Sequence, residues 1–513
     1  MKKSRLVILV LIYFIANILL LLSDGLWWDD WVIFGHSQIP ADTGQYIACY
    51  IHSIIMKSFD LDIVPYFYRC IAFVSSLINL FLIHKILKYA NFTDDLIFLI
   101  LLFVVALPMF SAKMTISCMI YYLSIPFFYG GTYELCKYLY TGNWMYRFLS
   151  ICLFFISLLI WHHAVVVIPI LVFILILSKR NELLFDKVNS ATVLKYSLRY
   201  IDFFLLPIAF FVIRNFFLMP KNVYQDYYSV KLESILISPF NLIQFYFVSF
   251  ADYFNTITEY CRDNHLTIFL PMLLSFVTFY ILKNKLNYDL SICKLKVLFL
   301  ISTILFLSAV VPFAVIGQSL ILFEDMSSRY QSLLILPFAI MIVCIIMLIN
   351  YKFIRLLLFS VFLSFSLFSS IILQLNYQRG WCKSLALMEL IKSESRLQEH
   401  SINILVQDNL NDWNEYPNQA WNNYVYTGIS RLMLHGDQSQ LYEIIESRGS
   451  THVLENDNAH MSFKYLLVLN RKRELTNVDV LCLTFDKIFN NRKFKQQIKE
   501  LISYDLVLMS CQI

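Results

Sequence analysis

Long runs of apolar residues constrain this chain more than any other feature of its sequence. They approach or reach the roughly 20 residues that a helix needs to cross the hydrocarbon core of a bilayer. The clearest are Leu6–Leu22, Leu96–Phe110, Leu295–Ile316 and Phe353–Leu373. Of the 513 residues, 59% are hydrophobic and 15% are charged, whereas soluble domains are roughly half apolar and about a quarter charged. The sequence therefore predicts a polytopic membrane protein, mainly α-helical.

Several functional classes are disfavoured by what the sequence lacks. The formal net charge of +5 comes without a basic stripe interleaved with aromatic residues, so nucleic-acid binding is not expected. The 11 cysteines include no CxxC pair, so neither a zinc site nor a disulfide framework is predicted. We find no GxSxG, P-loop, HExxH or GxGxxG motif, which leaves hydrolase, nucleotide-driven and metalloprotease functions without their signatures.

The lysines and arginines between the apolar runs predict an orientation. With the N-terminus in the cytoplasm, the cation-rich connections fall on the cytoplasmic side, as the positive-inside rule requires, and acidic connections such as Asp24–Asp30 fall outside. The count is about 11 transmembrane helices, which leaves the C-terminus outside. This count depends on residues 146–177, expected as two short helices that meet at His162-His163. It also depends on residues 239–260, expected as an amphipathic interfacial segment.

The composition becomes polar near Gln378, which divides the chain into a transmembrane catalytic domain, residues 1–378, and a soluble domain, residues 379–513. The soluble part alternates strand-like and helical patterns and is predicted to be a small α/β domain on the periplasmic side. The strand-like runs are 402–407, 480–485 and 506–509, and the helical patterns are 385–397, 418–434 and 487–502.

The most informative cluster is Trp27-Trp28-Asp29-Asp30-Trp31, directly after the first apolar run. A carboxylate at the outer membrane boundary can act as general base toward a hydroxyl group, and its neighbour can orient that group or help to hold a divalent cation, Mg²⁺ or Mn²⁺. Trp28 and Trp31 would then line the substrate. The alternative is an acidic loop whose tryptophans are ordinary interfacial anchors.

Cationic side chains near the same face are candidates for binding a phosphate. Arg329, followed by Tyr330, begins a late span, and its planar guanidinium suits bidentate phosphate recognition. Arg69 and Lys113 could neutralise the same group. For each of these cations the alternative is an ordinary interfacial charge that reaches the bulk lipid headgroups.

His162 and His163 lie where two short helices turn, a position at which polar groups tend to line a cavity. They could bind a sugar or a phosphate. Because adjacent side chains on a helix point in different directions, at most one is expected to contribute. The alternative is a hydrogen-bonded structural histidine.

Together these features resemble the GT-C type of multi-span glycosyltransferases, which take sugars from polyprenyl-phosphate carriers and have acidic residues in the first outer loop. Asp29 and Asp30 occupy that place here. Within that type, the chain is similar to bacterial and phage O-antigen glucosyltransferases in its length, its acidic-aromatic loop, the Arg329-Tyr330 pair and its C-terminal soluble domain. The resemblance covers about the first 375 residues.

The resemblance implies an inner-membrane enzyme that moves a sugar, with glucose favoured, from undecaprenyl phosphate to a hydroxyl of O-antigen or another surface or lipid-linked glycan. Asp29 or Asp30 would be the base, and Arg329, with Arg69, Lys113 or a histidine, would hold the leaving phosphate. The alternatives are a polysaccharide polymerase or ligase, a lipid-linked glycan flippase or transporter, and a non-enzymatic receptor. In the soluble domain Trp413, Tyr416, Trp421 and Tyr424 either stack on the acceptor glycan or form the core, and we favour the core.

Overall fold

The apolar runs of the sequence form long helices. The computed structural model of the chain describes residues 3–34, 44–179, 195, 197–221, 232–262, 265–283, 292–317, 326–398, 403–415, 420–433, 441–445 and 464–508. The α-helices of the first part are α1 (Lys3–Leu21), α2 (Asp30–Ile33), α4 (Tyr46–Ser58), α5 (Val64–Tyr89), α6 (Asp94–Ala106), α7 (Met119–Thr141), α8 (Trp144–Ile160), α9 (Val167–Lys179), α11 (Ile201–Phe217), α12 (Leu232–Arg262), α13 (His265–Lys283), α14 (Ile292–Val315), α15 (Ile335–Met347) and α16 (Lys352–Ser393). Three short 3₁₀ helices matter for the site: η1 (Ser111–Met114), η2 (His162–Ala164) and η4 (Met326–Leu333).

Five of these helices are long and apolar enough to cross a membrane, judged by length and composition within the described residues. They are α1, α5, α12, α14 and α16, and shorter apolar helices lie in α8, α9, α13 and α15. The chain therefore has the character of a membrane protein built mainly from helices, and the count of about 11 spans stays a prediction. The segment that we expected at the interface, residues 239–260, lies in α12, whose length and composition also fit a span.

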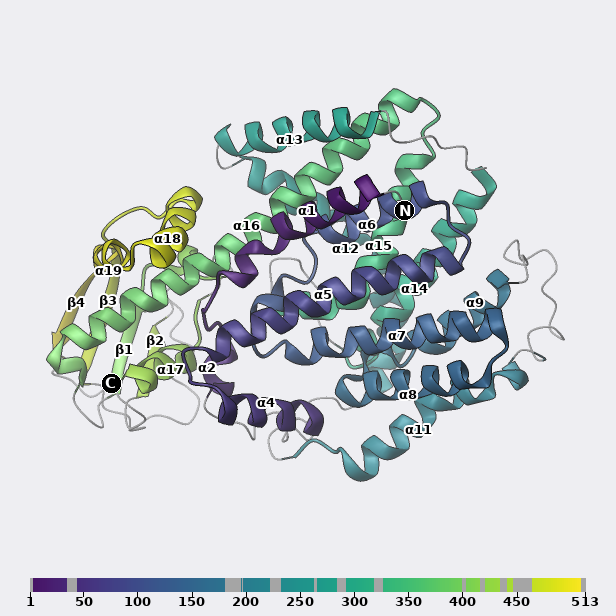
Figure 1. Cartoon of the computed structure of the whole chain (residues 1–513). Helices are drawn as coiled ribbons and strands as arrows, with labels where there is room; N and C mark the ends of the chain where they lie inside the picture. The colour runs from purple at the N-terminus through teal and green to yellow at the C-terminus, as the bar shows by residue number, and fades with distance from the viewer. Residues whose placement is uncertain are drawn as a thin grey trace.

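The predicted break near His162-His163 is confirmed. α8 ends at Ile160, η2 holds the two histidines, and α9 begins at Val167. α8 packs along α7, where Ser157 donates a hydrogen bond to the carbonyl of Ser124 and Ser150 donates to that of Gly131. Figure 1 shows α7, α8 and α5 running side by side on the part of the molecule away from the sheet.

α16 joins the two parts of the protein (Figure 1). This single helix of 42 residues begins among the apolar helices and continues without a break through Gln378, where the composition changes. Its polar residues bond to α1, because the side-chain amide of Gln374 donates to the carbonyl of Ala16 at 2.6 Å and that of Gln378 donates to Leu19 at 3.5 Å. The polar composition that begins at Gln378 therefore does not mark the end of the helix.

The C-terminal part is a small α/β unit, as expected. Its sheet has the order β2-β1-β3-β4, in which β1 pairs in parallel with β2 and β3, and β4 closes the edge antiparallel to β3. The strands are β1 (Asn403–Asp408), β2 (Leu441–Ile445), β3 (Tyr465–Arg471) and β4 (Ile502–Leu508), and the helices are α17 (Asn423–Met433), α18 (Asn477–Phe489) and α19 (Asn491–Lys499).

The individual elements of this unit match the expectations unevenly. The run 402–407 is β1, and 506–509 overlaps the end of β4, although 402 and 509 lie outside the described residues. The run 480–485 is wrong as a strand, because it lies inside α18. That helix is started by a capping box in which the Thr476 hydroxyl accepts the backbone N–H of Asp479 while the Asp479 carboxylate accepts that of Thr476. β2 and β3 were not expected from the sequence.

Candidate functional site

Asp29 lies in the connection between α1 and α2 and faces outward from it. One of its carboxylate oxygens is 4.0 Å from a guanidinium nitrogen of Arg329, and the other accepts a hydrogen bond of 3.2 Å from the hydroxyl of Tyr424. The side chain of Asp29 is 40% exposed and that of Arg329 is 20% exposed. An acid, a cation and a phenol from three distant segments therefore meet at a place that a ligand can reach.

Asp30 points the opposite way and is completely buried. Its two carboxylate oxygens accept backbone N–H groups, from Trp27 at 3.2 Å and from Ser117 at 2.8 Å, and one of them is 3.9 Å from a guanidinium nitrogen of Arg69. Arg69 is also fully buried and donates to the carbonyl of Gly25 at 2.7 Å. Asp30 and Arg69 thus form an internal ion pair that fixes the loop, and neither is available to a substrate.

The tryptophans of the cluster anchor this loop to the rest of the protein. Trp27 is 1% exposed and its indole N–H donates to the carbonyl of Tyr377 in α16 at 2.7 Å. Trp31 is equally buried and packs against Trp381, with ring centroids 6.1 Å apart. Only Trp28 of the three is part-exposed, and its ring meets Tyr424 edge to face. The anchors are contacts with protein, so membrane anchoring does not explain Trp27 and Trp31.

The backbone at Trp28 has φ of 50°, in the left-handed region that residues other than glycine seldom adopt. This conformation lies between the buried indole of Trp27 and the outward carboxylate of Asp29. Such backbone conformations persist where the surrounding contacts over-determine them, and they are frequent at functional sites. The fixed neighbours on both sides of Trp28 account for its persistence here.

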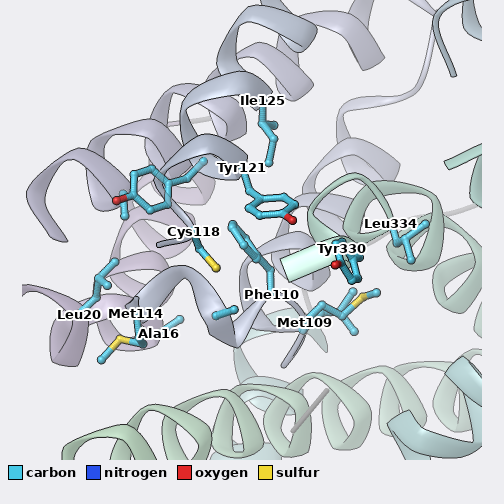
Figure 2. Close-up of a cluster of buried hydrophobic side chains, with 14 of the residues drawn as sticks. Ala16, Leu20, Met109, Phe110, Met114, Cys118, Tyr121, Ile125, Tyr330 and Leu334 are labelled. Atoms are coloured by element: carbon cyan, nitrogen blue, oxygen red, sulfur yellow. The ribbon is translucent and has the colours of Figure 1, made fainter. Parts of the chain in front are cut away.

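Arg329 lies on a layer of buried aromatic rings. Its guanidinium donates to the Tyr330 hydroxyl at 2.9 Å and lies 4.8 Å above the same ring. Tyr330 packs on Phe313 at 4.3 Å and on Tyr121 at 6.0 Å. Figure 2 shows Tyr121, Phe110 and Tyr330 gathered within one hydrophobic cluster. Tyr330 therefore orients Arg329, and its 5% exposure makes it a supporting residue more than a ligand-binding one.

The remaining candidates do not join Asp29 and Arg329. The ammonium group of Lys113 donates to the side-chain carbonyl of Asn17 at 2.7 Å. His163 is 1% exposed and lies behind Tyr121, with ring centroids 6.1 Å apart. His162 packs on Trp161 at 4.5 Å and lines a separate small cavity. The two histidines do face different surroundings, as the helix geometry requires.

The electrostatic setting separates the two aspartates further. Burial raises the pKa of Asp29 above its ordinary value, while Arg329 and the Tyr424 hydrogen bond each act to lower it. Burial raises the pKa of Asp30 to about 6, against the lowering effects of Arg69 and the backbone N–H groups. A raised pKa suits a general base at the part-buried Asp29, whereas at Asp30 it reflects the free-energy cost of enclosing the charge.

The acidic pair does not form a cation site. Both oxygens of Asp30 accept backbone N–H groups, whereas the oxygens of Asp29 contact Arg329 and Tyr424, so the two carboxylates have no common partner in this arrangement. Within the described ranges, no three His, Cys, Asp or Glu side chains come together as metal ligands. The described residues therefore do not bring together the several oxygen ligands that Mg²⁺ or Mn²⁺ prefers.

One residue of the site comes from the C-terminal unit. Tyr424 begins α17, 395 positions after the carboxylate that it contacts. Its sequence neighbours Trp413 and Trp421 are buried core residues, as favoured, and Tyr416 lies outside the described residues. Tyr424 was considered for sugar stacking or the core, and its contact with Asp29 has no local sequence signal. The pair forms because α17 packs against α2, where Gly428 leaves room for Trp31.

Comparison with known proteins gives no relative from which a function could be transferred. No protein-family model, no curated protein and no solved structure matches the chain.

Proposed function

We propose that this protein is a membrane glycosyltransferase that moves a sugar from a polyprenyl-phosphate carrier to a hydroxyl group of a surface or lipid-linked glycan. The observation that carries this proposal is the meeting of the Asp29 carboxylate with the Arg329 guanidinium at 4.0 Å, in a position that both side chains expose. This reaction needs an acid-base group for the acceptor and a cation for the leaving phosphate. The pair supplies one of each.

In the proposed reaction, Asp29 accepts the proton of the acceptor hydroxyl as its oxygen attacks the anomeric carbon. The bond between that carbon and the phosphate oxygen breaks, and the phosphate leaves with the electron pair. Arg329 stabilises the negative charge that develops on the phosphate. One displacement of this kind inverts the anomeric centre. Donor binding would separate the present ion pair, because the phosphate takes the place of the carboxylate on Arg329.

The remaining parts of the proposal follow the resemblance. The donor is an undecaprenyl-phosphate sugar, glucose being the first to test, and the acceptor is O-antigen or a related glycan. The enzyme would lie in a bacterial inner membrane with its N-terminus in the cytoplasm and its sheet unit in the periplasm.

Two alternative functions are separable from this one. A polysaccharide polymerase or ligase would rely mainly on outer arginines and histidines, and would tolerate changes at Asp29. A flippase or transporter would move a lipid-linked glycan without making a glycosidic bond. Neither of these functions requires the Asp29 carboxylate to face Arg329.

The test supplies membranes containing the protein with radiolabelled polyprenyl-phosphate glucose and an acceptor glycan. Wild-type protein should transfer label, whereas Asp29→Asn and Arg329→Gln should not. The matched control is Asp202→Asn, which breaks the ion pair with Arg147 at 2.7 Å in another part of the protein. Transfer that survives in Asp29→Asn at the level of this control would refute the assignment of the base.

A further inference from the structure

A cavity of about 80 Å³ lies among the helices beside η1. Its walls come from α1, α5, α6, α7, the segment around η1, and the junction of η4 with α15. The lining includes Asn17, Asn79, Lys113, Tyr122 and Ser332, and neither Asp29 nor Arg329 belongs to it. The cavity is therefore a second polar location, separate from the proposed reaction site.

Lys113 gives this cavity its charge. Among the described residues that line it, Lys113 is the one cation, and none is a carboxylate. Its ammonium group donates to the neutral amide of Asn17 at 2.7 Å, and burial lowers its pKa to about 8. An ammonium ion held among apolar helices without an opposite charge is unfavourable unless an anion compensates it. The cavity beside it provides the space for such an anion.

Two hydroxyl groups on the walls favour the same kind of ligand, whereas the side-chain oxygen of Asn79 is an acceptor. The hydroxyl groups of Tyr122 and Ser332 are buried without a hydrogen-bond partner, and so is the side-chain oxygen of Asn79. Buried polar groups are rarely left without partners in native proteins. Both hydroxyl groups can donate hydrogen bonds, as can the free N–H groups of Lys113, so the cavity is richest in donors.

The size of the cavity admits such a ligand. About 10–15 Å³ of cavity volume is enough to hold one water molecule, so a cavity of about 80 Å³ has room for several groups of that size. This is enough for the oxygens of one phosphate group.

We propose that the cavity beside Lys113 binds a phosphate-class anion, either inorganic phosphate or the phosphate monoester headgroup of a lipid. This site goes beyond the proposed transfer reaction and does not depend on it, because it shares no residue with the Asp29–Arg329 pair. Lys113 supplies the charge, and the hydroxyl groups of Tyr122 and Ser332 supply hydrogen bonds.

The experiment measures the thermal unfolding midpoint of the full chain in phosphatidylcholine nanodiscs. One arm titrates inorganic phosphate, and the other incorporates phosphatidic acid into the nanodisc. Ligands that bind the native state raise the midpoint. Wild-type protein should be stabilised in at least one arm, and the responding arm identifies the source of the phosphate. Lys113→Met should weaken the response about tenfold or more, equal to about 1.4 kcal/mol of binding free energy.

Two further variants keep the test decisive. Lys85→Met removes a lysine of α5 that lies over the Phe81 ring and outside the cavity, and it should respond like the wild type. Asn79→Asp keeps Lys113 but adds a carboxylate to the wall, and it should lose the response because the negative charge excludes the anion. A wild-type protein that responds in neither arm would overturn the proposal. So would equal responses in Lys113→Met and Lys85→Met, or an undiminished response in Asn79→Asp.

Discussion

Replacing each of the two neighbouring aspartates by asparagine should affect a different property of the protein: stability for Asp30 and reaction rate for Asp29. Asp30→Asn removes a fully buried charge that accepts two backbone N–H groups and faces Arg69 at 3.9 Å. One carboxylate oxygen is replaced by an NH₂ group that cannot accept the N–H of Trp27 or Ser117. A buried N–H left without a partner costs about 1–3 kcal/mol of stability. Asp30→Asn should therefore unfold at a clearly lower temperature.

Asp29→Asn should leave stability nearly unchanged. Its contact with Arg329 is long and part-exposed, and exposed pairs contribute only about 0–1 kcal/mol. The expected loss lies in catalysis, because a general base contributes roughly 100-fold to 10,000-fold to a reaction rate. Turnover by correctly inserted Asp29→Asn protein should fall within that range.

The assay pairs thermal unfolding of the purified protein with initial rates of glucose transfer from a polyprenyl-phosphate donor. Expression and membrane insertion of both variants are checked against Asp202→Asn. If Asp29→Asn lowered the unfolding temperature as much as Asp30→Asn, the division of roles would be incorrect. The same conclusion would follow if Asp30→Asn folded normally and lost only its rate.

Three further predictions concern the same region. Tyr424→Phe removes a hydrogen bond that lowers the pKa of Asp29, so the acid limb of the rate-against-pH profile should move to higher pH, while Asp202→Asn should not move it. Gly428→Ala places a Cβ 2.8 Å from that of Trp31. This overpacking should lower the free energy of unfolding by about 1–3 kcal/mol and should also lower the transfer rate. The raised pKa of Asp30 means that the native state binds its proton more tightly, so its contribution to stability should be lost as pH rises from about 4 to about 6. Unfolding measured across that range should show the loss in the wild type and not in Asp30→Asn.

The sequence was sufficient to predict the helical membrane character, the break at the paired histidines and the α/β nature of the C-terminal unit. Each of these depends on local pattern: apolar length, a polar interruption or alternating periodicity. The run 480–485 was misread as a strand because its Val, Leu, Thr and Phe residues suit a strand as well as a helix. The capping box directly before the run, at Thr476 and Asp479, was the local signal that indicates a helix.

The candidate site was harder to predict, because its geometry depends on distant packing. The sequence indicated that Asp29 and Asp30 were important but not that they point in opposite directions, which is decided by Ser117 and Arg69. It grouped Lys113 with Arg329 on charge alone, whereas Lys113 turns toward Asn17 in α1. Tyr424 was named for sugar stacking or the core, but nothing near it in the chain indicates its contact with Asp29.

The unbroken course of α16 has a mechanical consequence. At about 1.5 Å per residue its 42 residues extend over roughly 60 Å, about twice the thickness of the hydrocarbon core of a bilayer. Because α16 is continuous, it fixes both the distance of the sheet unit from the apolar helices and the rotation of that unit about the axis of α16. One residue inserted into α16 near Gln378 would turn everything beyond it by about 100°. Tyr424 would then be carried away from Asp29 even though neither residue had been altered.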